Sequence, residues 1–290
     1  MQQDKILVTG ATGNVGREVV NELAAQGDAA NVVAATLDER DAQRVPPGIA
    51  TTRLVFGDDA TYPGAFAGVR KLFLMRPPQI TDVQRYIFPL IDHAKAVGVE
   101  QIAFLSLLGV ENNQQVPHYK VEQYLKRCGV PTTYLRPSFY MQNLNTTHRQ
   151  EIRDEDRIAV PVGKAKTSFI DVRDIGAVAA KVLREPGHGN RAYALTGGEA
   201  LDYDQVAARF TEILGRKITY TNPSVIRFVI ASLLRGTKLS FALVMAFLYT
   251  QTRRGMADRV TDEVAHLLGR PPITMRQYIT DYADFWKSSA

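Results

Sequence analysis

The amino-acid sequence predicts an α/β protein built on a doubly wound parallel β-sheet, with a smaller, mostly helical lobe in its carboxyl-terminal half. Three observations lead to this prediction. Short, nearly continuous apolar runs recur along the first half, amphipathic helical patterns alternate with them, and a glycine-rich turn follows the first run. Parallel strands look apolar along their whole length because helices cover both faces of the sheet. With the glycine turn, the pattern is that of a Rossmann-type sheet.

The first predicted unit is a strand, a turn and a helix at the amino end. Residues 5–16 read KILVTGATGNVG, with an apolar run at 6–8 followed by Gly10, Gly13 and Gly16, and an amphipathic helical pattern comes next. Glycines let the backbone turn tightly and approach a pyrophosphate, while the N–H groups of the following helix point at its charge. An ordinary structural turn is the alternative. The position between a strand and a helix favours dinucleotide binding.

The rest of the first half continues the alternation of strands and helices. Right-handed crossovers between such strands place their carboxyl ends, and with them the ligand, at one edge of the sheet. Further strands are predicted at 31–36, 53–56, 71–75, 101–106 and 132–135, and helices at 81–97 and 118–127.

The second half changes character and becomes mainly helical. We expect residues 1–150 to form the dinucleotide-binding domain and residues 151–290 to form a lobe that caps the substrate. Short strands near 168–172 and 191–195 are expected to return to the main body. The apolar segment 225–249 is interrupted by charged residues, which predicts two short helices.

Composition and charge exclude several classes of partner. The chain has 290 residues, 45% hydrophobic and 22% charged, and its net charge of +5 is scattered. No basic cluster is interleaved with aromatic residues, so no nucleic-acid partner is expected. The longest uncharged run of the apolar segment, residues 239–251, is shorter than the roughly 20 residues that a membrane span needs, so no membrane association is expected.

Location and metal content follow from what the sequence lacks. The amino-terminal sequence MQQDK has no basic and apolar leader pattern, which predicts a cytoplasmic location. Cys128 is the single cysteine, and no histidine and cysteine cluster predicts a metal site. A homodimer is compatible with the sequence.

Several motifs together carry a family resemblance. The turn TGATGNVG, the phrase GDDATYPGAFAGV from Gly57, the stretch LRPSFYMQN from Leu135 and FIDVRDIG from Phe169 resemble the NmrA-like branch of the atypical short-chain dehydrogenase/reductases. The likeness extends through the closing stretch that ends at Trp286. That branch includes bacterial triphenylmethane reductases and quinone oxidoreductases, and also redox-sensing regulators. The resemblance therefore implies the fold more firmly than the reaction.

The resemblance implies a set of cofactor contacts. Asp58 would meet the adenine, although an exposed acidic turn is an equal alternative for this residue. The backbone near Met75 and Arg76 would line the ribose. The residues implied at the pyrophosphate are Gly10, Thr12, Gly13, Asn14, Val15 and Gly16, and those implied near the nicotinamide are Pro137, Ser138 and Phe139.

The choice of dinucleotide depends on the end of the second predicted strand. An acidic residue there selects the ribose diol of NAD, and a basic residue just after it selects the 2′-phosphate of NADP. This sequence has Thr36 followed by Leu37, with Arg40 and Arg44 further on. Thr36 does not repel a phosphate and either arginine is a candidate to reach it, so NADP(H) is favoured, with NAD(H) as the alternative.

The sequence departs from ordinary short-chain dehydrogenases at the proton-transfer pair. Those enzymes use Tyr-x-x-x-Lys, and in this chain Gln114 occupies the tyrosine slot and His118 the lysine slot. In one interpretation His118 contacts the cofactor ribose or the substrate and acts as an acid, since imidazole titrates near neutral pH. In the other it forms a surface hydrogen bond with Glu122, four residues on. Ser106, at a strand end, is either a hydrogen-bond donor to a substrate carbonyl or a turn former.

Two functions are consistent with these features. The first is an NAD(P)H-dependent oxidoreductase that delivers hydride to a small, apolar quinone, dye or conjugated carbonyl, because such chemistry depends mainly on positioning. Tyr140 and Phe241 are candidate walls for that acceptor, with core packing as the alternative for each. The second is a redox-sensing regulatory protein that binds NAD(P) without turnover, which the missing Tyr/Lys pair favours.

Overall fold

The computed structural model describes residues 4–287, and the chain separates into two compact units. The chain passes from the first unit to the second directly after Pro137 and returns twice. The first unit comprises Met1–Pro137, Val172–Leu195 and Glu263–Arg270, and the second comprises Ser138–Asp171, Thr196–Asp262 and Pro271–Ala290.

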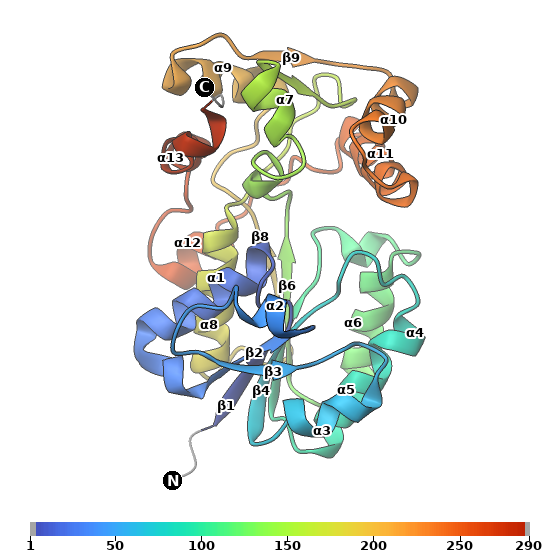
Figure 1. Ribbon diagram of the computed structural model, residues 1–290, viewed down its shortest axis with the longest axis vertical. Helices are drawn as coiled ribbons and strands as arrows, with labels where there is room; N and C mark the ends of the chain where they lie inside the picture. The colour runs from blue at the N-terminus through green and yellow to red at the C-terminus, as the bar shows by residue number, and fades with distance from the viewer. Residues whose placement is uncertain (1–3, 288–290) are drawn as a thin grey trace. The chain divides into compact units, whose positions relative to one another are not determined.

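A seven-stranded parallel sheet forms the centre of the first unit (Figure 1). The strand order is β3-β2-β1-β4-β5-β6-β8. Successive strands are added on one side of β1 up to β3 and on its other side from β4 onward, so the strand order reverses between β1 and β4. The predicted doubly wound parallel sheet is confirmed. Its strands are β1 (Lys5–Val8), β2 (Val32–Thr36), β3 (Ala50–Arg53), β4 (Val69–Met75), β5 (Gln101–Leu105), β6 (Thr132–Pro137) and β8 (Ala192–Leu195).

Helices cover both faces of this sheet. In Figure 1, α1 and α8 lie together on one side, and α5 and α6 lie on the other, where they pack over a core that includes Leu72, Ile102 and Phe104. The helices of this unit are α1 (Asn14–Leu23), η1 (Ala24–Asp28), η2 (Ala29–Asn31), α2 (Glu39–Ala42), η3 (Asp59–Thr61), α3 (Tyr62–Ala65), α4 (Val83–Tyr86), α5 (Phe88–Ala96), η4 (Val110–Asn112), α6 (Pro117–Cys128), α8 (Val172–Arg184) and α12 (Glu263–Leu268).

The single helix expected over residues 81–97 is two helices in the structure. α4 ends at Tyr86 and α5 begins at Phe88, with Pro89 in its first turn. Proline has no backbone N–H to donate to the preceding turn, so the helix breaks there.

The second unit is mainly helical, with one small parallel pair of strands, β7 (Arg157–Ala159) and β9 (Thr219–Thr221). Its core is formed by apolar and aromatic side chains that include Phe210 and Trp286, whose rings meet edge to face. The two short helices predicted over residues 225–249 are present as α10 and α11. The helices are η5 (Met141–Asn143), α7 (Arg149–Asp154), α9 (Tyr203–Leu214), α10 (Val225–Leu234), α11 (Leu239–Arg253), α13 (Met275–Asp281) and η6 (Ala283–Trp286).

Residues 168–172 form one isolated bridge where a strand was expected. Ile170 bridges to Tyr140, and α8 begins already at Val172. The backbone N–H of Ser168 donates to the carbonyl of Ala257, so this segment bonds to a loop instead of a neighbouring strand. The strand expected at 191–195 is β8, next to β6.

No helix among residues 4–287 combines the length and the apolar character needed to cross a membrane. The first three residues of the sequence MQQDK, on which the expected location depends, lie outside the described residues.

Candidate functional site

The glycine turn after β1 has a backbone path that only glycine permits at two positions. Gly10 adopts φ +63°, in the left-handed region that disfavours larger residues. A Cβ atom added at Gly16 would lie 2.1 Å from the carbonyl oxygen of Gly10, which is a severe clash. The N–H of Gly13 donates to the same carbonyl at 2.9 Å and closes the turn. These contacts bring the start of α1 directly against the end of β1.

The amino terminus of α1 is arranged to receive an anion. The helix begins at Asn14, its N-cap residue is Gly13, and no side chain caps its first turn. The N–H groups of a first helical turn have no partner within the helix, and the helix dipole adds positive potential there. This end follows β1, at the point where the order of the sheet reverses. The turn therefore fits the pyrophosphate of a dinucleotide.

Thr9 joins the ends of the two strands at this point of reversal. Its hydroxyl donates to the carbonyl of Phe73 at 3.0 Å and accepts from the N–H of Met75 at 2.8 Å. The Met75 side chain covers Gly10, since a Cβ at Gly10 would lie 2.6 Å from its Cγ. Sequence reasoning placed Met75 at the cofactor and missed Thr9.

A polar cluster joins the glycine turn to the segment after β2. The hydroxyl of Thr12 donates to Asp41 Oδ1 at 2.6 Å, and Arg44 donates to the carbonyl of Thr12 at 3.1 Å. The N–H of Leu37 donates to Asp41 Oδ2 at 3.2 Å. Asp41 was not singled out in the sequence, although its place two residues into a short helix after β2 is a signal that would have found it.

The residues considered for dinucleotide selection lie at this same corner. Thr36 is buried, and its hydroxyl donates to the carbonyl of Thr52 at 3.3 Å. Arg44 is held by Asp41 and Thr12. Arg40 is exposed and makes no ion pair or hydrogen bond among residues 4–287, so it is the arginine that remains available to a ligand.

Asp58 follows β3 in a turn at the same edge of the sheet. Its carboxylate lies 3.6 Å from the guanidinium of Arg53, and 41% of its side chain is exposed. The carbonyl of Asp58 accepts from Thr61 Oγ1 at 2.7 Å. The carboxylate is thus partly exposed and has one weak partner.

Arg76 holds the loop that follows β4. Its Nη1 atom donates to the carbonyls of Pro77 at 2.8 Å, Pro78 at 3.2 Å and Ile80 at 2.6 Å. Burial lowers its pKa from the usual arginine value. The guanidinium of Arg76 therefore donates its hydrogen bonds to carbonyls of the loop.

His118 lies one residue inside the start of α6. It is half-buried, its ring lies 6.2 Å from that of Phe104, and it forms no hydrogen bond within the described part of the chain. Burial, together with the positive charge of Arg76, lowers the pKa of His118 to about 3. This lowered pKa favours the neutral imidazole at physiological pH over the imidazolium acid considered from the sequence.

Glu122, the suggested partner of His118, faces the sheet instead. It is 1% exposed, it accepts from Ser106 Oγ at 2.7 Å, and it accepts from Arg136 Nε at 3.0 Å and Nη2 at 2.7 Å. Arg136 also pairs with Glu111 at 3.2 Å. The hydroxyl proton of Ser106 is thus committed to Glu122, which competes with a bond from Ser106 to a substrate carbonyl.

Of the residues expected near the nicotinamide, Pro137 belongs to the first unit, and Ser138 and Phe139 begin the second. Pro137 ends β6, and the Ser138 hydroxyl donates to the carbonyl of Ser168 within the second unit. Phe139 is half-buried and its ring stacks on that of Tyr249, with centroids 6.5 Å apart.

The two expected acceptor walls lie in the second unit. Burial raises the pKa of Tyr140, so its phenol is neutral. Phe241 lies on α11 and is 38% exposed. No group of histidine, cysteine, aspartate or glutamate that would hold a metal ion occurs within residues 4–287.

Comparisons with known proteins agree with this geometry. The chain is 32% identical over 283 residues to an NAD(P)H azoreductase of Xenophilus azovorans, covering 96% of this chain and 98% of that protein. It matches a crystal structure of an NADPH-dependent quinone oxidoreductase of Escherichia coli in complex with NADPH, with a TM-score of 0.86, 28% identity and coverage of 96% and 99%. The fold also matches that of Citrobacter sp. triphenylmethane reductase, with a TM-score of 0.86, 23% identity and coverage of 96% and 99%. Residues 2–278 match the model of the NmrA-like family, to which this chain therefore belongs.

Proposed function

We propose that the protein is an NAD(P)H-dependent oxidoreductase that reduces a small apolar acceptor such as a quinone, a dye or a conjugated carbonyl. The observation that carries this proposal is the glycine turn with the uncapped amino terminus of α1, at the point where the sheet order reverses. The azoreductase and quinone oxidoreductase names of its relatives support the same class of reaction.

In this proposal the turn binds the cofactor through backbone groups. When bound, the reduced nicotinamide supplies a hydride. Thr12 is held by Asp41, and this bond keeps the turn closed around the phosphate site. Arg40 is the candidate partner of a 2′-phosphate because it is exposed and uncommitted, which favours NADP(H) over NAD(H). The turn residues proposed at the pyrophosphate are Gly10, Thr12, Gly13, Asn14, Val15 and Gly16.

The remaining cofactor contacts follow from the order of the strands. Each proposed residue lies at or after the carboxyl end of a parallel strand, and these ends lie at one edge of the sheet. Asp58 is proposed at the adenine, Met75 and Arg76 at the ribose, and Pro137, Ser138 and Phe139 near the nicotinamide.

His118 is proposed to act through a neutral ring. With its pKa at about 3, its imidazole carries one N–H that donates a hydrogen bond to the ribose or to the acceptor oxygen. The proton that completes the reduction then comes from water, because a neutral imidazole is not an acid of useful strength. Tyr140 and Phe241 are proposed as apolar walls of the acceptor site.

Oxidation of NADPH tests the function. The purified protein is expected to oxidise NADPH with at least one member of a panel of quinones, azo dyes and triphenylmethane dyes, followed by loss of nicotinamide absorbance. Gly16→Ala, which places a Cβ against the Gly10 carbonyl, is expected to abolish NADPH binding and turnover together. His118→Ala is expected to lower turnover while the NADPH affinity persists.

A contrary result has a specific form. Tight binding of NADP(H) without turnover of any acceptor would contradict the oxidoreductase. If the reduced and oxidised cofactors then bound with different affinities, the regulatory alternative would replace it, because only such a difference shifts a conformational equilibrium.

We also propose a cytoplasmic location and a homodimer. A cytoplasmic location rests on the sequence alone. A homodimer is supported by the exposed apolar side chains of α10 and α11, which include Leu234 and Leu243, and light scattering of the purified protein tests it.

A further inference from the structure

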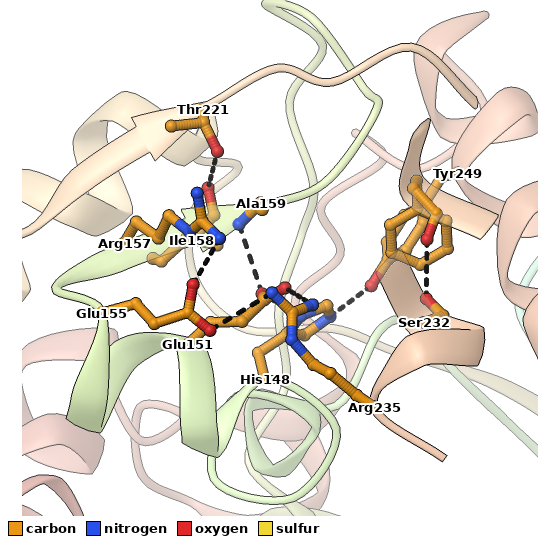
Figure 2. A network of polar contacts seen from close by, with 11 residues as sticks. His148, Glu151, Glu155, Arg157, Ile158, Ala159, Thr221, Ser232, Arg235 and Tyr249 are labelled. Atoms are coloured by element: carbon orange, nitrogen blue, oxygen red, sulfur yellow. Dashed lines mark hydrogen bonds and ion pairs between the residues drawn. The ribbon is translucent and has the colours of Figure 1, made fainter. Parts of the chain in front are cut away.

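The second unit contains a buried chain of three polar side chains, shown in Figure 2. His148 Nε2 lies 2.6 Å from the hydroxyl of Tyr249, and His148 Nδ1 lies 3.2 Å from Glu151 Oε2. The exposed fractions of the three residues are 3%, 2% and 4% for His148, Tyr249 and Glu151. Nothing in the proposed chemistry so far uses this chain.

The charge of Glu151 sets the direction of these hydrogen bonds. Burial by itself would raise the pKa of Glu151, but the hydrogen bond from His148 and the charge of Arg235 outweigh it and lower the pKa. The ionised carboxylate accepts a hydrogen bond from His148 Nδ1. The hydroxyl of Tyr249 donates to the other ring nitrogen, His148 Nε2. Burial raises the pKa of Tyr249 well above its usual value, so the phenol keeps the proton that it donates.

Glu151 also fixes the pair of helices α10 and α11 to α7. Arg235, directly after α10, lies 2.5 Å from Glu151 Oε1 and 3.3 Å from Glu155 Oε1. The N–H of Ala159 in β7 reaches Glu151 Oε2 at 3.4 Å. Tyr249 on α11 is the second attachment, through His148. Figure 2 shows both attachments meeting at α7.

The ring of Tyr249 links these three side chains to Phe139, which is proposed to lie near the nicotinamide. It stacks on Phe139 with a 6.5 Å centroid separation and a 20° angle between planes, and it meets Phe228 edge to face at 5.3 Å. Phe139 directly follows Ser138, at the start of the second unit. The position of the Tyr249 ring therefore determines the surface on which the Phe139 ring packs.

Apolar packing alone would hold these rings with less precision. Aromatic contacts vary slowly with a small slide of one ring past another, whereas a hydrogen bond weakens steeply when its geometry is lost. A fully satisfied buried polar network specifies a single arrangement of a core. Tyr249 has a hydrogen bond to His148 and a stacking contact with Phe139. The hydrogen bond is the contact that fixes the position of α11 relative to Phe139.

We propose that Tyr249 and His148 are positioning residues that set the orientation of Phe139 and thereby the selectivity for the acceptor. This inference rests on the proposed function, in which Phe139 lies near the nicotinamide. Tyr249 acts through Phe139 and does not itself touch the acceptor. The affinity for an aromatic acceptor depends on the hydrogen bonds among Tyr249, His148 and Glu151, and the affinity for the cofactor does not.

Tyr249→Phe tests the proposal because it removes the hydroxyl and keeps the ring. The readouts are the dissociation constants of menadione, a two-ring quinone, and duroquinone, a one-ring quinone, for the NADP⁺-loaded protein, followed by the KM and kcat of the same quinones. We expect the menadione dissociation constant to rise about fivefold, the size expected for one lost hydrogen bond. The preference for menadione over duroquinone should shrink, with KM rising more than kcat falls and the NADP⁺ affinity unchanged.

Tyr220→Phe is the matched control. Its hydroxyl donates to the carbonyl of Val160 at 3.0 Å and its ring stacks on Tyr203, so it loses a similar bond in the same unit without touching Phe139. His148→Gln, whose amide oxygen accepts a hydrogen bond, is expected to retain part of the menadione preference that His148→Leu loses. These variants also keep the test decisive if Tyr249→Phe does not fold.

The outcomes separate the inference from the proposed function. Unchanged quinone preference in Tyr249→Phe, or an equal change in Tyr220→Phe, overturns the positioning role. If the wild-type protein binds menadione without oxidising NADPH, the proposed function fails while the dissociation constants still decide the inference. If the loaded wild-type protein binds neither quinone, both are overturned.

Discussion

Each unit buries one glutamate against an arginine, and the two differ in what they join. Glu122 accepts from Ser106 and Arg136, which lie within 16 residues of it, so this network stabilises one β-α-β unit of the sheet. Glu151 binds Arg235, 84 residues away, and through His148 it reaches Tyr249. The first network secures local architecture. The second fixes a distant helix pair.

The two glutamates also differ in how completely they are enclosed. Glu122 receives two bonds from Arg136, whose side chain is 16% exposed, and the hydrogen bond raises the pKa of that arginine. Arg235, the partner of Glu151, is 26% exposed. Since removing one partner of a buried pair leaves an uncompensated charge, the more enclosed pair should be the more costly to break.

Glu122→Ala is expected to have the largest effect on stability. The substitution leaves Arg136 and Ser106 without their buried acceptor, and we expect a loss of about 3–5 kcal/mol in the free energy of unfolding. Urea denaturation measures it. Glu111→Ala, which removes the partly exposed second partner of Arg136, should cost less than about 1 kcal/mol. Equal losses for the two variants would contradict the comparison.

Arg235→Ala is expected to follow, with a loss of about 2 kcal/mol, because solvent and His148 compensate part of the charge on Glu151. The same denaturation experiment measures this loss. The control is Arg276→Ala, whose pair with Glu212 is more than half exposed on both sides, so water screens the pair and its removal should change the stability much less. If Arg235→Ala lowered the free energy of unfolding no more than the control does, the ion pair between Arg235 and Glu151 would contribute little to stability.

Ser106→Ala distinguishes a supporting serine from a catalytic one. Loss of its bond to Glu122 should cost about 1 kcal/mol of stability while kcat/KM for a quinone changes by less than about threefold. Thermal unfolding and steady-state kinetics are measured on the same preparation. A large drop in kcat at full stability would restore the role expected from the sequence, a hydrogen bond to the acceptor.

The dependence of stability on pH tests the environment of His118. The pKa of His118 is about 3 in the folded protein and about 6.5 in the unfolded chain, so the unfolded chain binds more protons between these values. Its contribution to stability is therefore full above pH 6.5 and is lost as the pH falls toward 3. The melting temperature of the wild type should fall more steeply from pH 7 to pH 4 than that of His118→Asn. Superimposable curves would show that His118 titrates normally.

The same pKa predicts a feature of catalysis. The dependence of kcat/KM on pH should show no limb from His118 between pH 5.5 and 8, because the ring stays neutral throughout. An activity that falls with rising pH near 6.5, and that loses this limb in His118→Asn, would instead identify His118 as an acid.

Much of the first unit could be predicted because its signals are local. Apolar runs such as the one at β1 identify buried strands, and the spacing of Gly10, Gly13 and Gly16 prescribes a backbone path. The single helix predicted over residues 81–97 was wrong because Pro89, which lacks a backbone N–H, splits it into α4 and α5. The backbone N–H of Ser168 bonds to the carbonyl of Ala257, a distant partner that no local pattern indicates.

The side-chain partners of the candidate site were not predictable in the same way. Helical spacing paired His118 with Glu122, yet the carboxylate of Glu122 accepts from Ser106, directly after β5, and from Arg136 on β6. The pKa of His118 follows from its burial and from Arg76, which lies 42 positions earlier in the chain. Neither fact has a periodic signature.

The sequence by itself determined the class of fold and the backbone path of the glycine turn, because apolar periodicity and glycine stereochemistry act over a few residues, and its motifs carried the resemblance to the family. Only the tertiary structure decided which polar side chains meet: Ser106 with Glu122, Thr12 with Asp41, and His148 with Tyr249 across 101 positions. The reason is physical. A buried hydrogen bond depends on where two elements cross in space, and chain crossings leave no mark in the local pattern of residues.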